Sequence, residues 1–302
     1  MKKKLLSDAL REFLLEKQLA GLSVESIKDY RNLVNSFVRF SGDVGINEVT
    51  DLVVDEYLSD LLSRPLSRST QISYIRNVKI FLKWLSCKYR VRYDYNRIHV
   101  PKEPKKNVHI YDESEIFKIF DAVQAESDWM ILRNKAILAL MLDSGIRQKE
   151  VCALRRDLVS FEKRYMVVQG KGDKERVVPL GLFSMELLKR YLEACPFQSK
   201  YIFVNRFGDM LTKNAVKILV GRLSKQLPFD LTSHKLRHNF ATNYCIDHYN
   251  EFGSMDAYKL MCLMGHEDME TTKRYLHHAT EIIAVQEHLS HLDRIRSKKD
   301  ER

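Results

Sequence analysis

A short stretch rich in proline and lysine divides this chain and limits what it can fold into. The segment from Val100 to Tyr111 reads VPKEPKKNVHIY, with two prolines, three lysines and few apolar residues. Such a composition is typical of a linker. We therefore expect two domains, at residues 1–100 and 111–302, joined by a linker at 101–110. Because 45% of the 302 residues are hydrophobic, each domain can bury a core of its own.

The basic charge of the chain is concentrated next to this linker. The formal net charge is +10, and the segment 64–106 holds 12 Lys and Arg against 2 Asp and Glu. The remaining residues balance to zero, so this segment carries the whole excess. A concentrated basic segment attracts a polyanion, and nucleic acid is the partner that we expect. The alternative is a solvated basic surface without a partner.

The cysteines argue against both a disulfide framework and a zinc site. They are odd in number, widely spaced and without a CxxC pair, and they stand at Cys87, Cys152, Cys195, Cys245 and Cys262. The N-terminal MKKKLLSDALREFLLEK is charged throughout and lacks the apolar stretch of a signal peptide. No run approaches the roughly 18 apolar residues of a membrane span. We expect a cytoplasmic protein without a membrane partner, metal or cofactor.

Periodic apolar residues predict that the first domain is helical. The predicted helices cover about residues 5–19, 23–40, 49–62 and 67–89. In the last of them, an apolar stripe contains Ile72, Ile75, Val78, Leu82 and Leu85. Basic residues fall mostly on another side of that helix, at Arg68, Arg76, Lys79 and Lys83. We expect the apolar side to pack on the other helices and the basic side to meet phosphates.

The second domain is predicted to be mostly helical with a small antiparallel sheet. Helical patterns cover about residues 112–124 and 129–143 and return after Leu182. Between them, the runs at 165–169 and 176–180 flank a turn that contains glycine and predict a β-hairpin. The expected fold class of the chain is therefore mainly α with a small antiparallel sheet (α+β).

Four short patterns in the second domain could carry chemistry. The first, SGIRQKEV at 144–151, places Arg147 after a glycine turn and Glu150 one helical turn later. A guanidinium at a helix start can grip a phosphate with its planar fork. The alternative interpretation is an ordinary surface arginine.

The second pattern, QGKGDKERVVPL at 169–180, places Lys171 between two glycines at the hairpin tip. The glycines let the backbone approach a ligand closely, so the hairpin could insert a lysine into a groove. The pattern lacks the GK[ST] ending of a nucleotide-binding P-loop. An ordinary hairpin with a charged turn is the alternative.

The third pattern, TSHKLRHNFAT at 232–242, places His234, Arg237 and His238 on one helix face. Two histidines at this spacing are similar to a zinc protease motif, but Lys235 stands where that motif has glutamate. An arginine between the histidines would also repel a metal cation. A phosphate fits better, because the arginine neutralises charge while a histidine holds or moves a proton.

The fourth pattern, LMGHEDMETTKRYLH at 263–277, places His266 after a glycine and Tyr275 nine residues later. Tyrosine is a poor nucleophile because its free pKa is about 10. Arginine, lysine and histidine around it would favour the phenolate and make it usable. Taken alone, Tyr275 would be interpreted as a packed aromatic residue.

Together, and in this order, the four patterns resemble the catalytic motifs of tyrosine recombinases, the phage integrase and Xer-like family. The resemblance covers about residues 110–285. The first domain resembles the family's helical core-binding domain only in size, helicity and charge. The resemblance implies a site-specific recombinase that cleaves and rejoins double-stranded DNA through a 3′-phosphotyrosyl intermediate, with no need for metal or ATP.

The resemblance also implies a catalytic set, which consists of Arg147, Lys171, His234, Arg237, His266 and Tyr275. The two arginines would hold the non-bridging oxygens of the scissile phosphate, and the lysine would protonate the leaving 5′-oxygen. His234 would exchange a proton near the attacking tyrosine, and His266 would hydrogen-bond the phosphate. Glu150 and His238 match supporting positions and are interpreted as structural.

The sequence leaves alternatives open for the function and for the end of the chain. A type IB topoisomerase would nick and reseal one duplex, and a DNA-binding regulator would carry an idle catalytic domain. The intact catalytic set argues against the idle domain. The last apolar stripe contains Ile282, Ile283, Val285, Leu289 and Leu292. It can pack on its own domain or dock on a neighbouring protomer, which the resemblance implies for a tetramer on two DNA sites.

Overall fold

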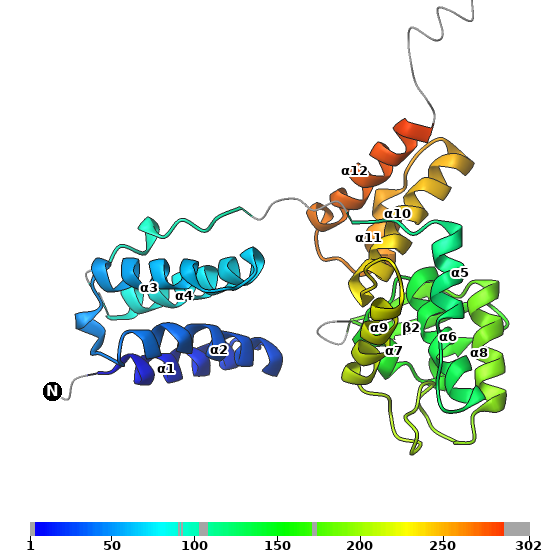
Figure 1. Ribbon diagram of the computed structural model, residues 1–302, viewed down its shortest axis with the longest axis horizontal. Helices are drawn as coiled ribbons and strands as arrows, with labels where there is room; N and C mark the ends of the chain where they lie inside the picture. The colour runs from blue at the N-terminus through cyan, green and yellow to red at the C-terminus, as the bar shows by residue number, and fades with distance from the viewer. Residues whose placement is uncertain (1–3, 90, 92, 103–107, 171–173, 287–302) are drawn as a thin grey trace, which may run out of the picture. The chain divides into compact units, whose positions relative to one another are not determined.

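Separate hydrophobic cores divide the chain into two units, Met1–Lys106 and Asn107–Arg302 (Figure 1). The structure is a computed structural model, and it describes residues 4–89, 91, 93–102, 108–170 and 174–286. The division falls inside the segment that was predicted as a linker. The prediction of a mainly helical chain with one small antiparallel sheet is confirmed for the described residues.

The N-terminal unit is built from four helices in its described part, and these are α1 (Leu6–Leu19), α2 (Val24–Phe40), α3 (Asp51–Ser63) and α4 (Arg68–Tyr89). Side chains that are typical helix caps begin two of them. The Ser23 hydroxyl accepts a hydrogen bond from the backbone N of Ser26 at the start of α2. The Thr50 hydroxyl accepts one from the backbone N of Val53 at the start of α3. Two short 3-10 turns, η1 (Ile46–Glu48) and η2 (Tyr95–Arg97), complete the unit.

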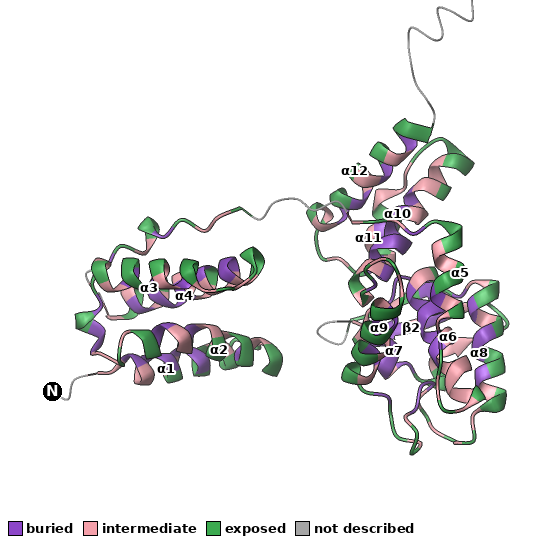
Figure 2. Cartoon of the chain, in the orientation of Figure 1, coloured by how far each residue is buried: buried purple, intermediate pink, exposed green. Residues whose placement is uncertain are grey.

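Aromatic side chains fill the core of this unit. Phe13, Phe37, Tyr57 and Phe81 are fully buried, and the rings of Phe13 and Phe81 meet edge to face with centroids 5.5 Å apart. The apolar stripe predicted for α4 is buried at all five of its positions (Figure 2). Burying each such side chain contributes roughly 1.5–3 kcal/mol, so α4 is held mainly by this face.

The larger unit begins with a helical layer around a small sheet. Its helices are α5 (Glu113–Asp121), α6 (Asp128–Asp143), α7 (Gln148–Ala153), α8 (Leu182–Ala194) and α9 (Lys213–Gln226), with a 3-10 turn η3 (Arg156–Leu158). The strands β1 (Val159–Ser160), β2 (Tyr165–Gln169) and β3 (Glu175–Pro179) pair antiparallel in the order β1-β2-β3. The predicted hairpin is therefore confirmed, with Val167 opposite Val177. Its tip at 171–173 lies outside the described residues.

Three further helices, α10 (Ser233–Phe252), α11 (Ala257–Met264) and α12 (Met269–Gln286), form a second core in this unit. Phe240, Met264 and Tyr275 are buried in it. Helix α10 also packs on α6, so it connects the two cores of the unit. Its N-terminal half carries the predicted HKLRH motif at this junction. None of the helices in the described part of the chain is long and apolar enough to cross a membrane.

Candidate active site

The GIR turn after α6 places Arg147 at the start of α7. Gly145 adopts a φ of +58°, and a Cβ there would collide with the ring of Phe240, so both conformation and space require glycine. The Arg147 backbone N donates to Glu150 Oε2 at 2.6 Å, and its Nη1 donates to Glu150 Oε1 at 2.9 Å. Its Nη2 donates to the carbonyl of Gly265 at 3.0 Å.

Arg237 reaches the same place from α10. It is only 6% exposed and donates to the carbonyls of Gly145 and Met264. The two arginines therefore bind consecutive carbonyls, those of Met264 and Gly265, in the turn after α11. Burial and the neighbouring charge of Arg147 lower the pKa of Arg237 to about 9. Two close guanidiniums are a costly arrangement that an anion between them would relieve.

Arg176 on β3 belongs to this cluster, although sequence analysis missed it. Its Nη1 and Nη2 donate to Glu150 Oε1 and Oε2 at 2.7 and 2.8 Å, and its Nε donates to the Leu263 carbonyl at 2.7 Å. Burial would raise the pKa of Glu150, but hydrogen bonds from Arg176 and Arg147 outweigh it and lower that pKa to about 2. Glu150 thus binds two arginines of this cluster at once. Glu150 and Arg176 are 26 positions apart in the sequence, so motif spacing did not reveal the pair.

His266 lies beside the two arginines. Its Nδ1 is 2.9 Å from the hydroxyl of the buried Thr272, and its Nε2 is 3.5 Å from Arg237 Nη2. Burial, followed by the charges of Arg237 and Arg147, lowers the pKa of His266 to about 4. The ring is therefore neutral near pH 7 and carries one N–H.

Tyr275 is both a packed aromatic residue and a member of the cluster. It is 0% exposed, its ring is nearly parallel to that of His266 at 5.9 Å, and the ring of His238 is 4.7 Å away. Its Oη accepts a hydrogen bond from Arg274 Nη2 at 2.8 Å. Nothing in the sequence indicated this contact, because neighbouring residues of a helix normally point apart. In this position the Tyr275 side chain is shielded from solvent.

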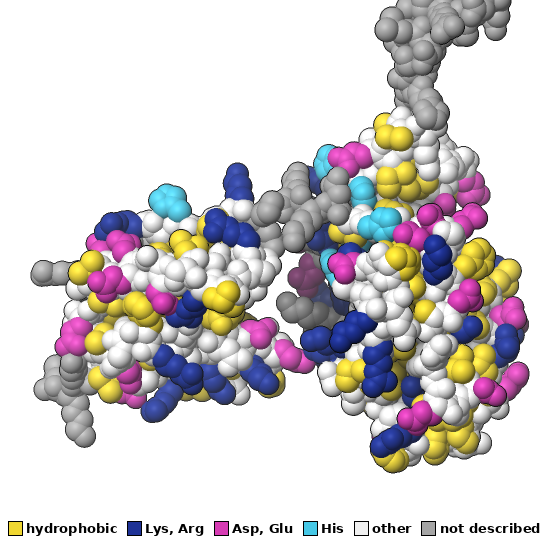
Figure 3. Space-filling model, viewed as in Figure 1, with side chains coloured by type: hydrophobic (Ala, Val, Ile, Leu, Met, Phe, Trp, Pro, Cys, Tyr) yellow, Lys and Arg dark blue, Asp and Glu magenta, His cyan; other side chains and the backbone are white. Residues whose placement is uncertain are grey.

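The two histidines of the HKLRH motif differ in environment. His238 is 6% exposed, its Nδ1 lies 3.4 Å from the Thr242 hydroxyl, and burial followed by the charge of His278 lowers its pKa to about 4. His234 is exposed at the start of α10, and its ring lies 6.4 Å from that of His238. Its pKa is lowered, first by desolvation and then by Arg274 and Arg237. Several histidine side chains are visible on the surface near α10, α11 and α12 (Figure 3).

The predicted Lys171 lies outside the described residues. The residues that flank it connect the hairpin to the cluster, because Lys174 Nζ lies 3.7 Å from Glu267 Oε1, next to His266. In the described part of the chain, no three His, Cys, Asp or Glu side chains come together in a way that could hold a metal ion.

The basic side of α4 in the N-terminal unit is partly covered. Lys79 Nζ donates to the carbonyl of Ile98 at 2.8 Å, and Lys83 Nζ lies 5.9 Å from the ring centre of Tyr95. Lys79 is therefore half-buried beneath the chain that follows α4, whereas Lys83 remains exposed. The expected contact of this side of α4 with phosphates stays a prediction. Arg68 and Arg76 are exposed and form no ion pair or hydrogen bond through their side chains with any described residue.

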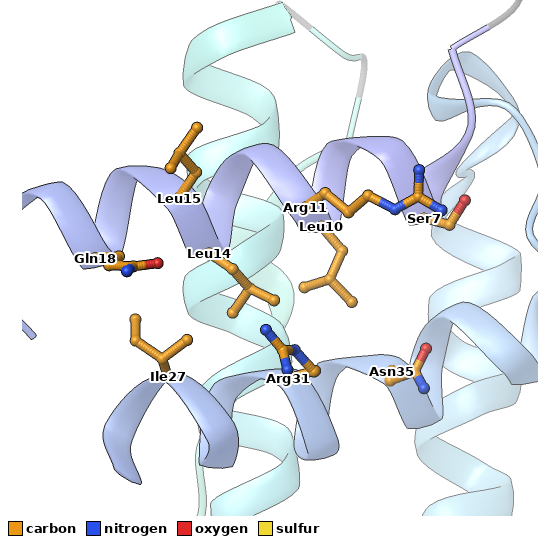
Figure 4. Close-up of a pocket in the computed structure, with 9 residues that line it drawn as sticks. All are labelled: Ser7, Leu10, Arg11, Leu14, Leu15, Gln18, Ile27, Arg31 and Asn35. Carbon is orange, nitrogen blue, oxygen red and sulfur yellow. The ribbon is translucent and has the colours of Figure 1, made fainter. Parts of the chain in front are cut away.

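Exposed basic residues also line α1 and α2, which sequence analysis did not select. A groove between these helices has an apolar floor at Leu10, Leu14 and Ile27, with Arg11 and Arg31 beside it (Figure 4). The space-filling view shows further Lys and Arg side chains along this edge of the unit (Figure 3). The basic surface of the unit is therefore wider than the segment 64–106.

Comparison with known proteins relates this arrangement to one family. The profile of the phage integrase family matches residues 110–281, and that of the phage integrase N-terminal SAM-like domain matches residues 9–91. The tyrosine recombinase XerC of Lacticaseibacillus casei is 29% identical over 285 residues, which cover 89% of this chain and 92% of the relative. XerC of Staphylococcus carnosus is 31% identical over 228 residues, covering 73% and 75%.

A solved structure agrees on the fold. A lambda integrase dimer bound to a COC′ core site superposes with a TM-score of 0.72 at 15% identity, covering 90% of this chain and 77% of that one. The expected resemblance is thereby confirmed by sequence and by fold. Since the family profile spans more than half of its residues, this chain belongs to the phage integrase family of tyrosine recombinases.

Proposed function

We propose that this protein is a site-specific DNA recombinase that cleaves and rejoins double-stranded DNA through a covalent link to Tyr275. The observation that carries the proposal is the convergence of Arg147 and Arg237 on two consecutive carbonyls, with His266 and Tyr275 beside them. Two relatives are named tyrosine recombinases, which supports the reaction class.

In this proposal, the two guanidiniums hold the non-bridging oxygens of the scissile phosphate. Negative charge on those oxygens grows in the transition state, and fixed positive charge stabilises it without reorganisation. His266 is neutral and donates one further hydrogen bond to an oxygen. The protein's own cations thus take the part that a metal ion plays elsewhere, and we propose a metal-independent reaction.

The bond changes balance within the protein and the DNA. Tyr275 Oη attacks phosphorus and loses its proton, which passes to His234 directly or through water. The bond from phosphorus to the 5′-oxygen breaks, and Lys171 supplies the proton that the leaving oxygen needs. Desolvation and the charges of Arg274 and Arg237 lower the pKa of His234, which favours the neutral form that can accept a proton. The 3′-phosphotyrosyl bond conserves the energy of the broken bond, so rejoining needs no ATP.

We further propose that the N-terminal unit binds the DNA backbone. Its exposed arginines include Arg68 and Arg76 on α4 and Arg31 on α2. A tetramer on two DNA sites would complete the exchange. At the end of α12, Val285 is 72% exposed and Ile282 borders a groove, so this end presents an apolar edge to a neighbouring protomer.

Capture of a covalent adduct tests the proposal. The purified chain is incubated with a pool of nicked duplexes of randomised sequence, in which a short fragment diffuses away after cleavage and prevents rejoining. Adducts that survive denaturant are isolated, sequenced and mapped to the linked residue. We expect a recurrent sequence and a DNA link at Tyr275. Absence of adduct across the pool would refute the proposal, and plasmid relaxation without strand exchange would favour a topoisomerase.

A further inference from the structure

We propose that Arg176 is a positioning residue that fixes both the Arg147 guanidinium and the turn carrying His266 for the cleavage reaction. The inference rests on the proposed function, because it concerns the geometry of that phosphate site. Arg176 does not belong to the catalytic set that the motifs predicted.

The three donors of Arg176 connect three separate segments. Its fork binds both oxygens of Glu150 on α7, and its Nε binds the Leu263 carbonyl at the end of α11. The residue itself belongs to β3, the strand that leaves the hairpin containing Lys171. A bidentate contact of this kind fixes orientation as well as distance. The side chain is 11% exposed, so water competes little for these bonds.

The first consequence concerns Arg147. Glu150 is 3% exposed, and its carboxylate receives four hydrogen bonds, two from Arg176 and two from Arg147. Because Arg176 occupies one side of both oxygens, the carboxylate cannot rotate. The Arg147 Nη1 bound to Oε1 is therefore held in one place, and with it the fork that we propose to bind phosphate.

The second consequence concerns the turn that precedes α12. Gly265 has a φ of +59°, and a Cβ there would lie 3.1 Å from Arg176 Cδ and Nη1. The Arg176 side chain thus lies directly against the turn whose Met264 and Gly265 carbonyls receive Arg237 and Arg147. Losing Arg176 would free this turn on one side and shift His266, which follows it.

A double variant separates positioning from simple stabilisation. Arg176→Met alone leaves the buried Glu150 charge without its main partner, which can unfold the protein. Glu150→Gln combined with Arg176→Met removes that charge, while the new amide keeps an oxygen that can accept from the backbone N of Arg147. We expect thermal unfolding near that of the wild type. Because Glu150 also binds Arg147, the reference is Glu150→Gln alone. Relative to it, single-turnover adduct formation on the nicked duplex recovered from the pool should slow by about ten- to a hundred-fold in the double variant, since small misplacements have such effects.

A matched pair in the same unit provides the control. Arg155 forms an exposed bidentate pair with Asp157, two residues along the chain. The double variant Asp157→Asn with Arg155→Met should keep the wild-type rate. Affinity for the duplex should stay close to that of the wild type in both double variants. A Glu150→Gln and Arg176→Met protein that is folded and forms adduct at the rate of Glu150→Gln alone would show that Arg176 serves stability alone.

Hydrogen exchange gives a readout that needs no DNA. The backbone N–H groups of Gly265 and His266 donate to Cys262 and Met261 at 3.0 and 3.1 Å. In the Glu150→Gln and Arg176→Met variant, we expect these amides to exchange at least about ten-fold faster, as local opening becomes easier. Unchanged exchange would overturn the positioning role. If the wild type forms no adduct, the proposed function fails, and the exchange measurement still decides the role of Arg176.

Discussion

Tyr275 is surrounded by groups that can act on it, and yet it is fully buried. The rings of His238 and His266 enclose it, and Arg274 donates to its hydroxyl. Tyr275→Phe removes the hydroxyl and leaves this packing in place. We expect the variant to bind the recovered duplex as the wild type does and to form no covalent adduct in a denaturing gel assay. A Phe variant that still formed the adduct would show that another residue is the nucleophile.

The two arginines at the Met264–Gly265 turn allow a test of transition-state binding. Arg147→Ala and Arg237→Ala should each slow single-turnover cleavage by about two to three orders of magnitude, because each removes one preorganised donor. Affinity measured by fluorescence anisotropy should fall much less. An equal fall in affinity and rate would make them ordinary binding arginines. Arg237→Ala also needs a thermal unfolding control, since it leaves two buried carbonyls without a donor.

His238 makes the stability of the protein depend on pH. Its pKa is lowered from 6.5 to about 4 in the folded chain, so between these values the unfolded chain binds more protons. The free energy of unfolding should therefore decrease as pH falls from 6.5 to 4, by up to about 1.4 kcal/mol per pH unit. His238→Gln should reduce this slope in urea titrations at several pH values. A His238→Gln protein that kept the wild-type slope would contradict this assignment.

At the scale of elements, the basic residues of helix α4 differ in their exposure and contacts. Arg68 and Arg76 are exposed, whereas Lys79 is half-buried and bound to the Ile98 carbonyl. Lys83 is exposed, and its Nζ lies 5.9 Å from the ring centre of Tyr95. Each phosphate contact contributes about 0.9 to the slope of log affinity against log salt. Arg68→Ala with Arg76→Ala should flatten that slope by about two units. Lys79→Ala with Lys83→Ala should flatten the slope less. Equal effects of the two double variants would contradict the proposal that Arg68 and Arg76 contact phosphates in preference to the two lysines.

The helices and strands could be predicted from the sequence because each follows from a local periodic pattern of apolar residues. The stripe of α4 and the hairpin at 165–179 follow from spacing alone, and both are present. The covering of Lys79 was not accessible, because it depends on the path of the chain after Tyr89. Arg176 and Arg274 were missed for the same reason. The contacts of Arg176 depend on tertiary packing, and the contact of Arg274 depends on its side chain turning back to the hydroxyl of Tyr275. Neither kind of contact produces a periodic pattern in the sequence.

For the site, motifs predicted which residues belong to it but not how deeply they are buried. Motifs brought Arg147, Arg237, His266 and Tyr275 to attention, and the structure places all four in one cluster. The burial of Tyr275 could not be predicted, because it depends on how α10, α11 and α12 close their shared core. His234 lies at the edge of this cluster, and Lys171 stays a prediction.

At the scale of the whole molecule, two units with separate cores share one substrate in our proposal. If both bind the same duplex, the second binding step is intramolecular, and the linker raises its effective concentration. A specific protease site inserted in the segment 101–110 allows this coupling to be removed after folding. Cutting should lower the affinity for the recovered duplex by about a hundred-fold or more, while circular dichroism of both fragments stays unchanged. The inserted but uncut chain is the control and should bind as the wild type does. Cut protein that binds as tightly as uncut protein would show that one unit supplies the affinity alone, and the proposed backbone contacts of the other unit would then lose their support.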